Sequence, residues 1–185
     1  GVLEGGLLLA QALFERGDLL SSRSTLELLP KKLRPERDWR RRLLWARITA
    51  AESKLDGELL NQALLMGDQL RTIAEQRDWG NQLVAAYQLR AELFEQKSDW
   101  DRAAQEYSHL LKVGLPLEIR RRAFLNVILL RIKAGDTSGA LSVLRHLQLQ
   151  ADLKSIQPLA ECMMGEIQLS LYRAGEGNQL SLAAA

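Results

Sequence analysis

Five short turn signals recur along the chain at almost constant spacing, and this repeat constrains the fold more than any other feature of the sequence. Between positions 17, 57, 98, 135 and 175 the separations are 40, 41, 37 and 40 residues. A repeat of this length, with helix-type patterning between the turns, is typical of helical solenoids, in which each repeat unit stacks on its neighbours. The signals are Gly17-Asp18, Asp56-Gly57, Ser98-Asp99, Gly135-Asp136 and Gly175-Glu176.

The residues on either side of the third turn have the spacing of two amphipathic helices. Apolar positions recur every three or four residues before the turn, at Leu83, Tyr87, Ala91 and Phe94. They do so again after it, at Ala103, Tyr107, Leu110 and Leu111. Such spacing places each set on one face of a helix. We therefore expect an antiparallel hairpin, which needs stacked neighbours because it cannot bury both of its faces alone.

The composition agrees with an all-helical protein and gives little indication of its partners. Hydrophobic residues make up 46% of 185 residues, and Leu and Ala, which are strong helix formers, dominate them. The formal net charge of +2 is too small to indicate nucleic acid or an anionic membrane as a partner. No stretch has the roughly 18 apolar residues of a membrane span. The single cysteine, Cys162, excludes an intrachain disulfide, so a reducing compartment is allowed and the cytoplasm is favoured.

The third turn and its flanking residues resemble the tetratricopeptide (TPR) repeat family. In a TPR unit a small residue lies midway along the first helix and a large residue follows three positions later. A Gly-Asp-type turn then precedes an Ala early in the second helix. The matching residues are Ala91, Phe94, Ser98-Asp99-Trp100, Ala103 and Tyr107. The fourth turn has a similar set, which is Gly135-Asp136, Ala140, Leu144 and Leu147.

The other turns match the TPR pattern less closely. The first follows Ala10 but has Ser22 where Ala is usual, and in the second either Gln62 or Ala63 takes the Ala position. A fifth first helix is expected over residues 159–174. The period also exceeds the usual one of about 34 residues. Links that contain proline, at 30–35, 115–116 and 157–158, account for the extra length, because Pro disfavours helix at the residue before it.

The resemblance implies an all-α fold, a right-handed α-solenoid of stacked antiparallel helix hairpins, in a single domain over residues 1–185. The expected repeat units are 3–34, 38–76, 78–114, 117–152 and 156–185, and the chain is expected to be a fragment of a larger protein. Longer TPR-like units occur in the sensor domains of large bacterial transcription activators of the maltose-regulator type and in helical scaffold subunits. The resemblance does not choose between these two settings.

A TPR-like stack also implies a concave groove lined by the first helix of each repeat unit. The exposed candidates for partner binding there are Gln88, Glu92, Arg122, Asn126 and Leu129. The spacing of Arg122 and Asn126 resembles the clamp with which some TPR proteins hold a peptide carboxylate. That clamp needs matching Lys and Asn residues in the preceding unit, where Gln88 and Glu92 supply the wrong charge. A plain groove contact is the alternative.

A basic stretch flanks the proline link between the first two repeat units. Its residues are Lys31, Lys32, Arg34, Arg37, Arg40, Arg41 and Arg42. One interpretation is a patch for an acidic partner or for phosphate. The alternative is a solvated link, because Glu36 and Asp38 are interleaved with the basic residues.

Three tryptophans follow an aspartate at an expected helix start, and they are Trp39, Trp79 and Trp100. Asp is a good N-cap, so we expect these carboxylates to cap helices and the indoles to pack between repeat units. A platform on which a bound peptide stacks is the alternative for the indoles.

The sequence contains no recognisable catalytic, metal-binding or cofactor-binding motif. His109 and His146 are isolated, and no Cys or His cluster has the spacing of metal ligands. We therefore expect no cofactor, no metal and no enzymatic activity. The expected function is a protein-protein interaction scaffold that binds a partner peptide or helix. The alternatives are an effector-sensing segment of a larger bacterial regulator, or self-association through the C-terminal hairpin, with Leu159, Ile167, Leu169 and Leu171.

Overall fold

The computed structural model describes most of the chain, and every element it describes is a helix. The described residues are 2–53, 57–112, 115–149, 151–156, 158–159, 161–163, 165–166, 169 and 172. Helices account for 85% of them, and no strand occurs among them. The all-α class expected from the composition and periodicity is confirmed. No helix in these ranges is both long enough and apolar enough to cross a membrane.

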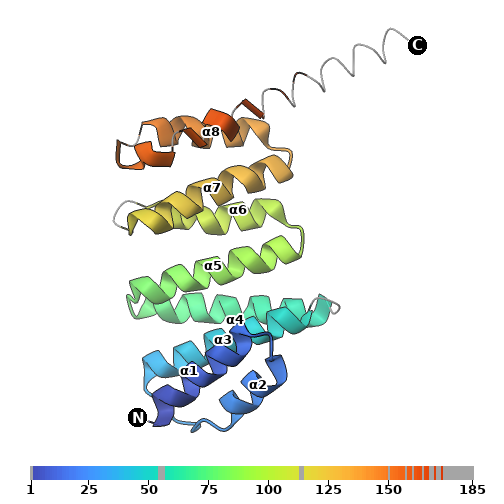
Figure 1. Cartoon of the computed structure of the whole chain (residues 1–185), viewed down its shortest axis with the longest axis vertical. Coiled ribbons are helices and arrows are strands. Elements are labelled where there is room, and N and C mark those ends of the chain that lie inside the picture. The colour runs from blue at the N-terminus through green and yellow to red at the C-terminus, as the bar shows by residue number, and fades with distance from the viewer. Residues whose placement is uncertain are drawn as a thin grey trace, which may run out of the picture. The chain divides into compact units, whose positions relative to one another are not determined.

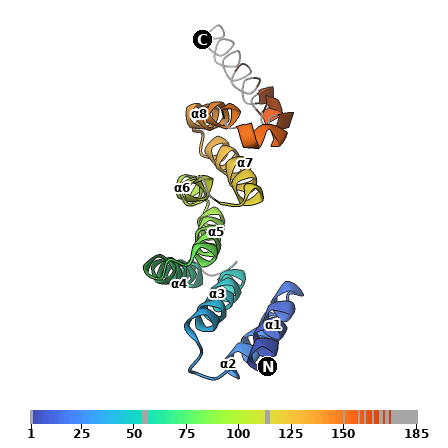
Figure 2. The ribbon, with the colours of Figure 1, turned by 90° about the vertical axis from the view of Figure 1, so that its left-hand side faces the viewer.

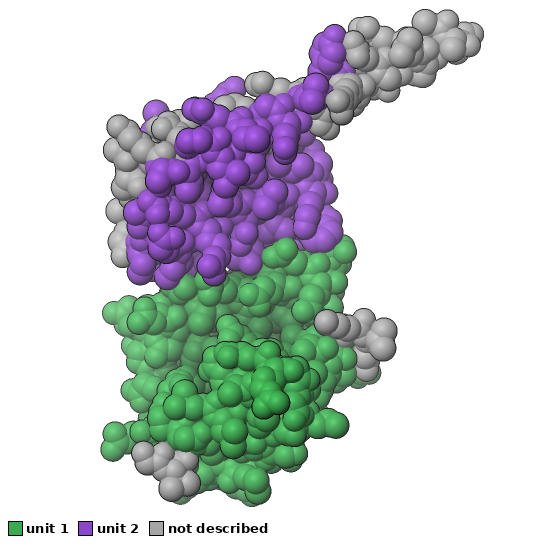
Figure 3. All heavy atoms as spheres, in the orientation of Figure 1, with its two compact units in different colours: residues 1–98 green, residues 99–185 purple. Residues whose placement is uncertain are grey.

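The chain divides into two compact units, residues 1–98 and residues 99–185 (Figure 3). The first compact unit contains α1 (Val2–Glu15), α2 (Leu19–Glu27), α3 (Pro35–Glu52), α4 (Gly57–Gln76) and α5 (Gly80–Gln96) (Figure 1). The second contains α6 (Trp100–Ser108), α7 (Leu117–Lys133) and α8 (Thr137–Gln148), with short 3-10 helices η2 (His109–Leu111) and η3 (Ala151–Ile156). The division falls inside the expected repeat unit 78–114, and the expected unit 156–185 lies largely outside the described residues.

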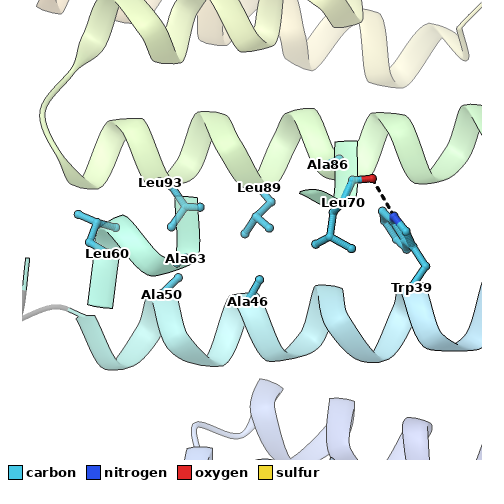
Figure 4. Close-up of a cluster of buried hydrophobic side chains, with 9 residues drawn as sticks. All are labelled: Trp39, Ala46, Ala50, Leu60, Ala63, Leu70, Ala86, Leu89 and Leu93. Atoms are coloured by element: carbon cyan, nitrogen blue, oxygen red, sulfur yellow. Dashed lines mark hydrogen bonds between the residues drawn. The ribbon is translucent and has the colours of Figure 1, made fainter. Parts of the chain in front are cut away.

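In the first compact unit, consecutive helices pack against each other, and α3 also contacts α1 and α5 (Figure 2). Two clusters of buried side chains form its core. One joins α1, α2 and α3 through Leu7, Ala10, Leu26, Leu44 and Ile48. The other joins α3, α4 and α5, and Figure 4 shows its members: Trp39, Ala46, Ala50, Leu60, Ala63, Leu70, Ala86, Leu89 and Leu93.

Trp39 lies inside this second cluster, as the sequence predicts for it. Its side chain is 3% exposed, and its indole Nε1–H donates to the carbonyl oxygen of Leu70 at 3.0 Å (Figure 4). Trp79 and Trp100 are only half-buried, and each has a cation over its ring: Arg77 at 5.1 Å and Lys133 at 4.8 Å. In both cases a cation from the protein itself occupies one face of the indole ring and makes a cation–π contact there.

In the second compact unit, α7 packs against α6, α8, η2 and η3. The core of this unit consists of large apolar side chains from α7 and α8 with Leu153 and Met163 after them. Its buried members are Phe124, Ile128, Ala140, Leu144, Leu147, Leu153 and Met163. Three of the four apolar positions expected after the third turn are buried here too, since Ala103, Tyr107 and Leu110 are at most 6% exposed, while Leu111 is half-buried against the core.

The small residues that the repeat pattern singles out are buried. Ala10, Ala63, Ala91, Ala103 and Ala140 are all fully buried. The structure therefore identifies Ala63, not the exposed Gln62, as the small residue of the second expected repeat unit. Ser22, which stands where Ala was expected, is also fully buried, and its hydroxyl donates to the carbonyl oxygen of Ala10 at 2.7 Å.

Four tight turns share one backbone geometry, in which the second residue after the end of the helix adopts a left-handed conformation. The φ angles are 81° at Gly17, 52° at Asp78, 57° at Ser98 and 78° at Gly135. Around Gly17 and Gly135 two backbone hydrogen bonds close the helix end, including Asp18 N–H to the Leu13 carbonyl (2.9 Å) and Asp136 N–H to the Arg131 carbonyl (2.8 Å). This is the Schellman pattern of helix termination, which needs a residue able to adopt positive φ.

At three of these turns an aspartate starts the next helix. The carboxylates of Asp18, Asp99 and Asp136 accept from backbone N–H groups three residues on, at 3.1, 3.3 and 2.8 Å. Each bond satisfies an N–H group that has no partner within the helix. These three turns were predicted from the sequence.

The expectation of an aspartate cap before each tryptophan is wrong in two of three cases. Asp38 lies in the first turn of α3, which starts at Pro35, and it pairs with Arg41 and Arg42 instead. Asp78 is itself the left-handed residue, and α5 begins after Trp79 without a side-chain cap. Of the second expected turn, Gly57 is the first residue of α4 and Asp56 lies outside the described residues, as do residues 175–176 of the fifth expected turn.

Candidate partner-binding pocket

A pocket of about 280 Å³ opens in the first compact unit between α1, α3 and α5. Side chains from all three helices line it: Phe14, Arg47, Ala50, Ala51, Leu89, Glu92, Leu93 and Gln96. The α3 residues are spaced by three and one, and the α5 residues by three, one and three. That spacing places each set on one face of its helix. The pocket therefore lies where three alternate helices of the chain present their faces together.

The floor of the pocket is apolar and belongs to the core. Ala50, Leu89 and Leu93 are at most 6% exposed and are members of the cluster that joins α3, α4 and α5. Because core side chains are close-packed, they hold this floor in one shape. The small side chains of Ala50 and Ala51 leave the space that the pocket occupies. A larger residue at either position would fill it.

Two opposite charges stand on the walls, Arg47 from α3 and Glu92 from α5. The pKa of the Glu92 carboxyl is raised, first because the surrounding atoms withdraw it from water, and also by repulsion from Glu95; the attraction of Arg47 partly opposes these effects. The Glu92 side chain remains exposed at the pocket wall, and neighbouring protein atoms withdraw part of it from bulk water. A partly desolvated carboxylate gains more than a fully solvated one from pairing with a ligand.

Gln96 makes one wall of the pocket polar. Gln96 lies 3.5 Å from the hydroxyl of Ser53, which itself is buried and donates to the carbonyl oxygen of Ala50 at 2.6 Å. The stronger bond to Ala50 fixes the Ser53 hydroxyl at the end of α3. The amide of Gln96 keeps most of its hydrogen-bonding capacity for a ligand.

Glu92 is the one sequence-predicted groove residue in this pocket. Gln88 lies one turn earlier on α5 and is half-buried, outside the pocket lining. Arg122, Asn126 and Leu129 belong to α7 of the second compact unit. Arg122 is exposed, Asn126 is half-exposed, and Leu129 is 48% exposed, so the three form one accessible face of α7 by their spacing of four and three.

The sequence prediction missed Arg47 and Phe14, although the repeat contains a signal for one of them. The second and third turn signals are 41 residues apart, and Arg47 precedes Gln88 by 41 residues. The repeat register that selected Gln88 therefore also selects Arg47. Phe14 has no such signal, because its place in the pocket depends on how α1 crosses α3.

Four of the seven cations in the basic stretch form ion pairs, and they share two carboxylates. Arg37 and Arg40 both pair with Glu4 of α1, at 3.3 and 2.6 Å. Arg41 and Arg42 both pair with Asp38, at 2.5 and 2.8 Å. These contacts favour the interpretation of a solvated, internally paired link over a free patch for phosphate.

The three remaining members of the stretch, Lys31, Lys32 and Arg34, are all exposed. Within the described part of the chain none of the three makes an ion pair closer than 4.0 Å. Lys31 differs from the other two because it also lines a pocket, which is described below.

No metal-binding cluster of three or more His, Cys, Asp or Glu residues occurs within the described ranges. The ring of His146 lies 6.4 Å from that of Phe124 in the second core. Cys162 is exposed and has a free thiol. No protein-family model matches this sequence, and no curated protein matches it.

Proposed function

We propose that this chain is a non-catalytic, TPR-like scaffold that binds a short segment of a partner protein. In this proposal the helices stack as a right-handed solenoid of antiparallel hairpins, and α1, α3 and α5 are the first helices of successive repeat units. The three capped left-handed turns and the fully buried small residues support that arrangement, because they are the features that the TPR resemblance rests on.

The observation that carries the proposal is the pocket between α1, α3 and α5. It combines an apolar floor with two opposite charges and the side-chain amide of Gln96 on its walls. An apolar partner side chain would occupy the floor, a partner carboxylate would pair with Arg47, and a partner amine or N–H group would pair with Glu92. Apolar anchoring with polar groups that set register is how grooves of this kind recognise peptides.

Peptide selection on the immobilised full-length chain tests this function. Peptides from a random phage-displayed library are titrated by fluorescence polarisation against the wild type and Ala51→Arg, which fills the pocket from its wall. The matched control is Gln69→Arg, on the exposed side of α4. We expect Ala51→Arg to weaken binding of the selected peptides at least about tenfold, since it removes access to the floor, and Gln69→Arg to leave it unchanged. Equal binding by all three proteins would overturn the proposal.

A second candidate function is self-association through the C-terminal region. Leu159 and Leu169 are each 49% exposed and Tyr172 is 64% exposed, so this segment presents apolar surface that a second copy could cover. Ile167 and Leu171, which the sequence also suggested, lie outside the described residues. Light scattering on wild type and Leu169→Glu distinguishes the cases, because only a self-associating chain changes mass with this substitution.

A further inference from the structure

A second pocket in the first compact unit lies on the opposite face of α3 from the pocket between α1, α3 and α5. It has a volume of about 370 Å³. The lining residues are Leu26, Glu27, Leu29, Lys31, Arg41, Arg42, Trp45 and Met66. On a helix that turns by about 100° per residue, Arg41, Arg42 and Trp45 point roughly half a turn away from Arg47, Ala50 and Ala51. The two pockets therefore do not share a wall on α3.

The short length of α2 explains why this space exists. That helix has 9 residues whereas α4 has 20, which corresponds to about 14 Å against 30 Å. After Glu27 the chain leaves the helix and returns to α3 through residues 28–34, which include Leu29 and Lys31. The pocket is bounded by the end of α2, this link, α3 and Met66 of α4.

The walls of this pocket are apolar. Leu26 is 2% exposed, and Leu29 and Trp45 pack against the same core cluster. The Arg23 guanidinium lies 5.6 Å from the centre of the Trp45 ring and is itself paired with Glu52 at 2.6 Å. These two contacts restrict the position of the indole. Met66 adds an adaptable thioether. An aromatic or acyl group would find contacts on several sides.

The rim of the pocket carries an excess of positive charge. Arg41 and Arg42 share one carboxylate, that of Asp38, so two guanidinium groups face a single negative charge. Lys31 adds a third cation, which has no ion pair in the described part of the chain. Glu27 is the only acidic residue in the lining. Three cations around an apolar cavity complement a ligand with an apolar body and an anionic end.

We propose that this pocket binds a small amphipathic anion, with an aromatic or acyl body against Trp45 and Met66 and a carboxylate, sulfonate or phosphate near Lys31. The volume is at the lower end of the range of small-molecule sites. The proposal goes beyond the peptide-binding function and does not depend on it, because the residues of the two pockets are different. It would make the chain a scaffold that also responds to a small effector.

The probe for the test is 8-anilinonaphthalene-1-sulfonate, whose fluorescence rises in an apolar site, titrated into the folded full-length chain. We expect a single saturable site. Lys31→Gln should weaken binding about three- to fivefold, which is the effect of one partly exposed ion pair. The matched control is Lys32→Gln, since Lys32 is the adjacent exposed lysine but does not line the pocket. Glu27→Gln should tighten binding by a similar factor.

A filling variant and a neutral probe complete the test. Met66→Trp should abolish the saturable site while circular dichroism shows an unchanged helix content. N-phenyl-1-naphthylamine, which has a similar apolar body without the sulfonate, should bind more weakly to the wild type. Equal affinities for Lys31→Gln and Lys32→Gln, equal affinities for the two probes, or no saturable binding up to millimolar concentration would each overturn the proposal.

Discussion

At the scale of single residues, Ser22 shows how a polar side chain occupies a position that a small apolar one usually fills. It is fully buried, and its one hydroxyl donor is satisfied by the Ala10 carbonyl at 2.7 Å. Ser22→Ala should lower the free energy of unfolding by about 1 kcal/mol through the lost hydrogen bond. Ser22→Leu should lower it by about 1–3 kcal/mol through overpacking. Urea unfolding at constant temperature measures both, and a leucine variant as stable as the wild type would show that the site is not close-packed.

Glu92 gives a prediction about pH at the same scale. Burial raises its pKa in the folded chain above the unfolded value of 4.5. Between the unfolded pKa and the higher folded pKa, the folded state holds more protons than the unfolded state. The free energy of unfolding of the wild type therefore falls as pH rises through this range. Glu92→Gln removes this loss. We expect the variant to be more stable than the wild type at pH 7, with the difference shrinking as pH falls below the unfolded pKa.

Urea titrations of the two proteins at pH 4 and pH 7 measure this difference. Glu36→Gln serves as the control, because Glu36 is an exposed carboxylate on α3 that neither lines the pocket nor is among the groups that raise the pKa of Glu92. A Glu92→Gln advantage that is the same at both pH values would contradict the raised pKa.

At the scale of elements, residues in the left-handed conformation end the helices. The free-energy cost of that conformation depends on whether the residue has a Cβ. Gly17 and Gly135 adopt positive φ without a Cβ penalty, whereas Asp78 and Ser98 adopt it with one. Gly17→Ala should therefore destabilise by about 1 kcal/mol, and Ser98→Gly and Asp78→Gly should each stabilise by up to about 1 kcal/mol. Thermal unfolding checks the signs. Gly5→Ala is the control, since Gly5 lies within α1 in open space; it should stabilise slightly.

At the scale of the whole molecule, three clusters of buried side chains among the described residues each lie within one compact unit. The clusters around Leu26 and Leu70 use only residues before 98, and the cluster around Phe124 uses only residues after 98. We expect a fragment of residues 1–98 to be helical and to unfold cooperatively, because its cores are built from its own helices. Circular dichroism during heating tests this, and a gradual loss of signal without a transition would contradict it.

Sequence periodicity determined the helices of this protein and most of its turns. Apolar residues every three or four positions specify an amphipathic helix locally, and Gly-Asp or Ser-Asp pairs specify where it ends and the next begins, so Gly17, Ser98 and Gly135 could be identified without a structure. The aspartates before Trp39 and Trp79 were misjudged. A start at Pro35 and a left-handed Asp78 depend on backbone geometry that composition does not specify.

Only the tertiary structure decided which side chains meet. It placed Phe14 and Arg47 beside Glu92, paired Arg37 and Arg40 with the distant Glu4, and brought Lys31 into the lining of a pocket while leaving Lys32 outside. A helical repeat specifies which face of a helix is buried, and that information is local in the chain. Pockets and ion pairs arise from the angles and lengths of neighbouring helices, and these depend on how whole faces pack against one another.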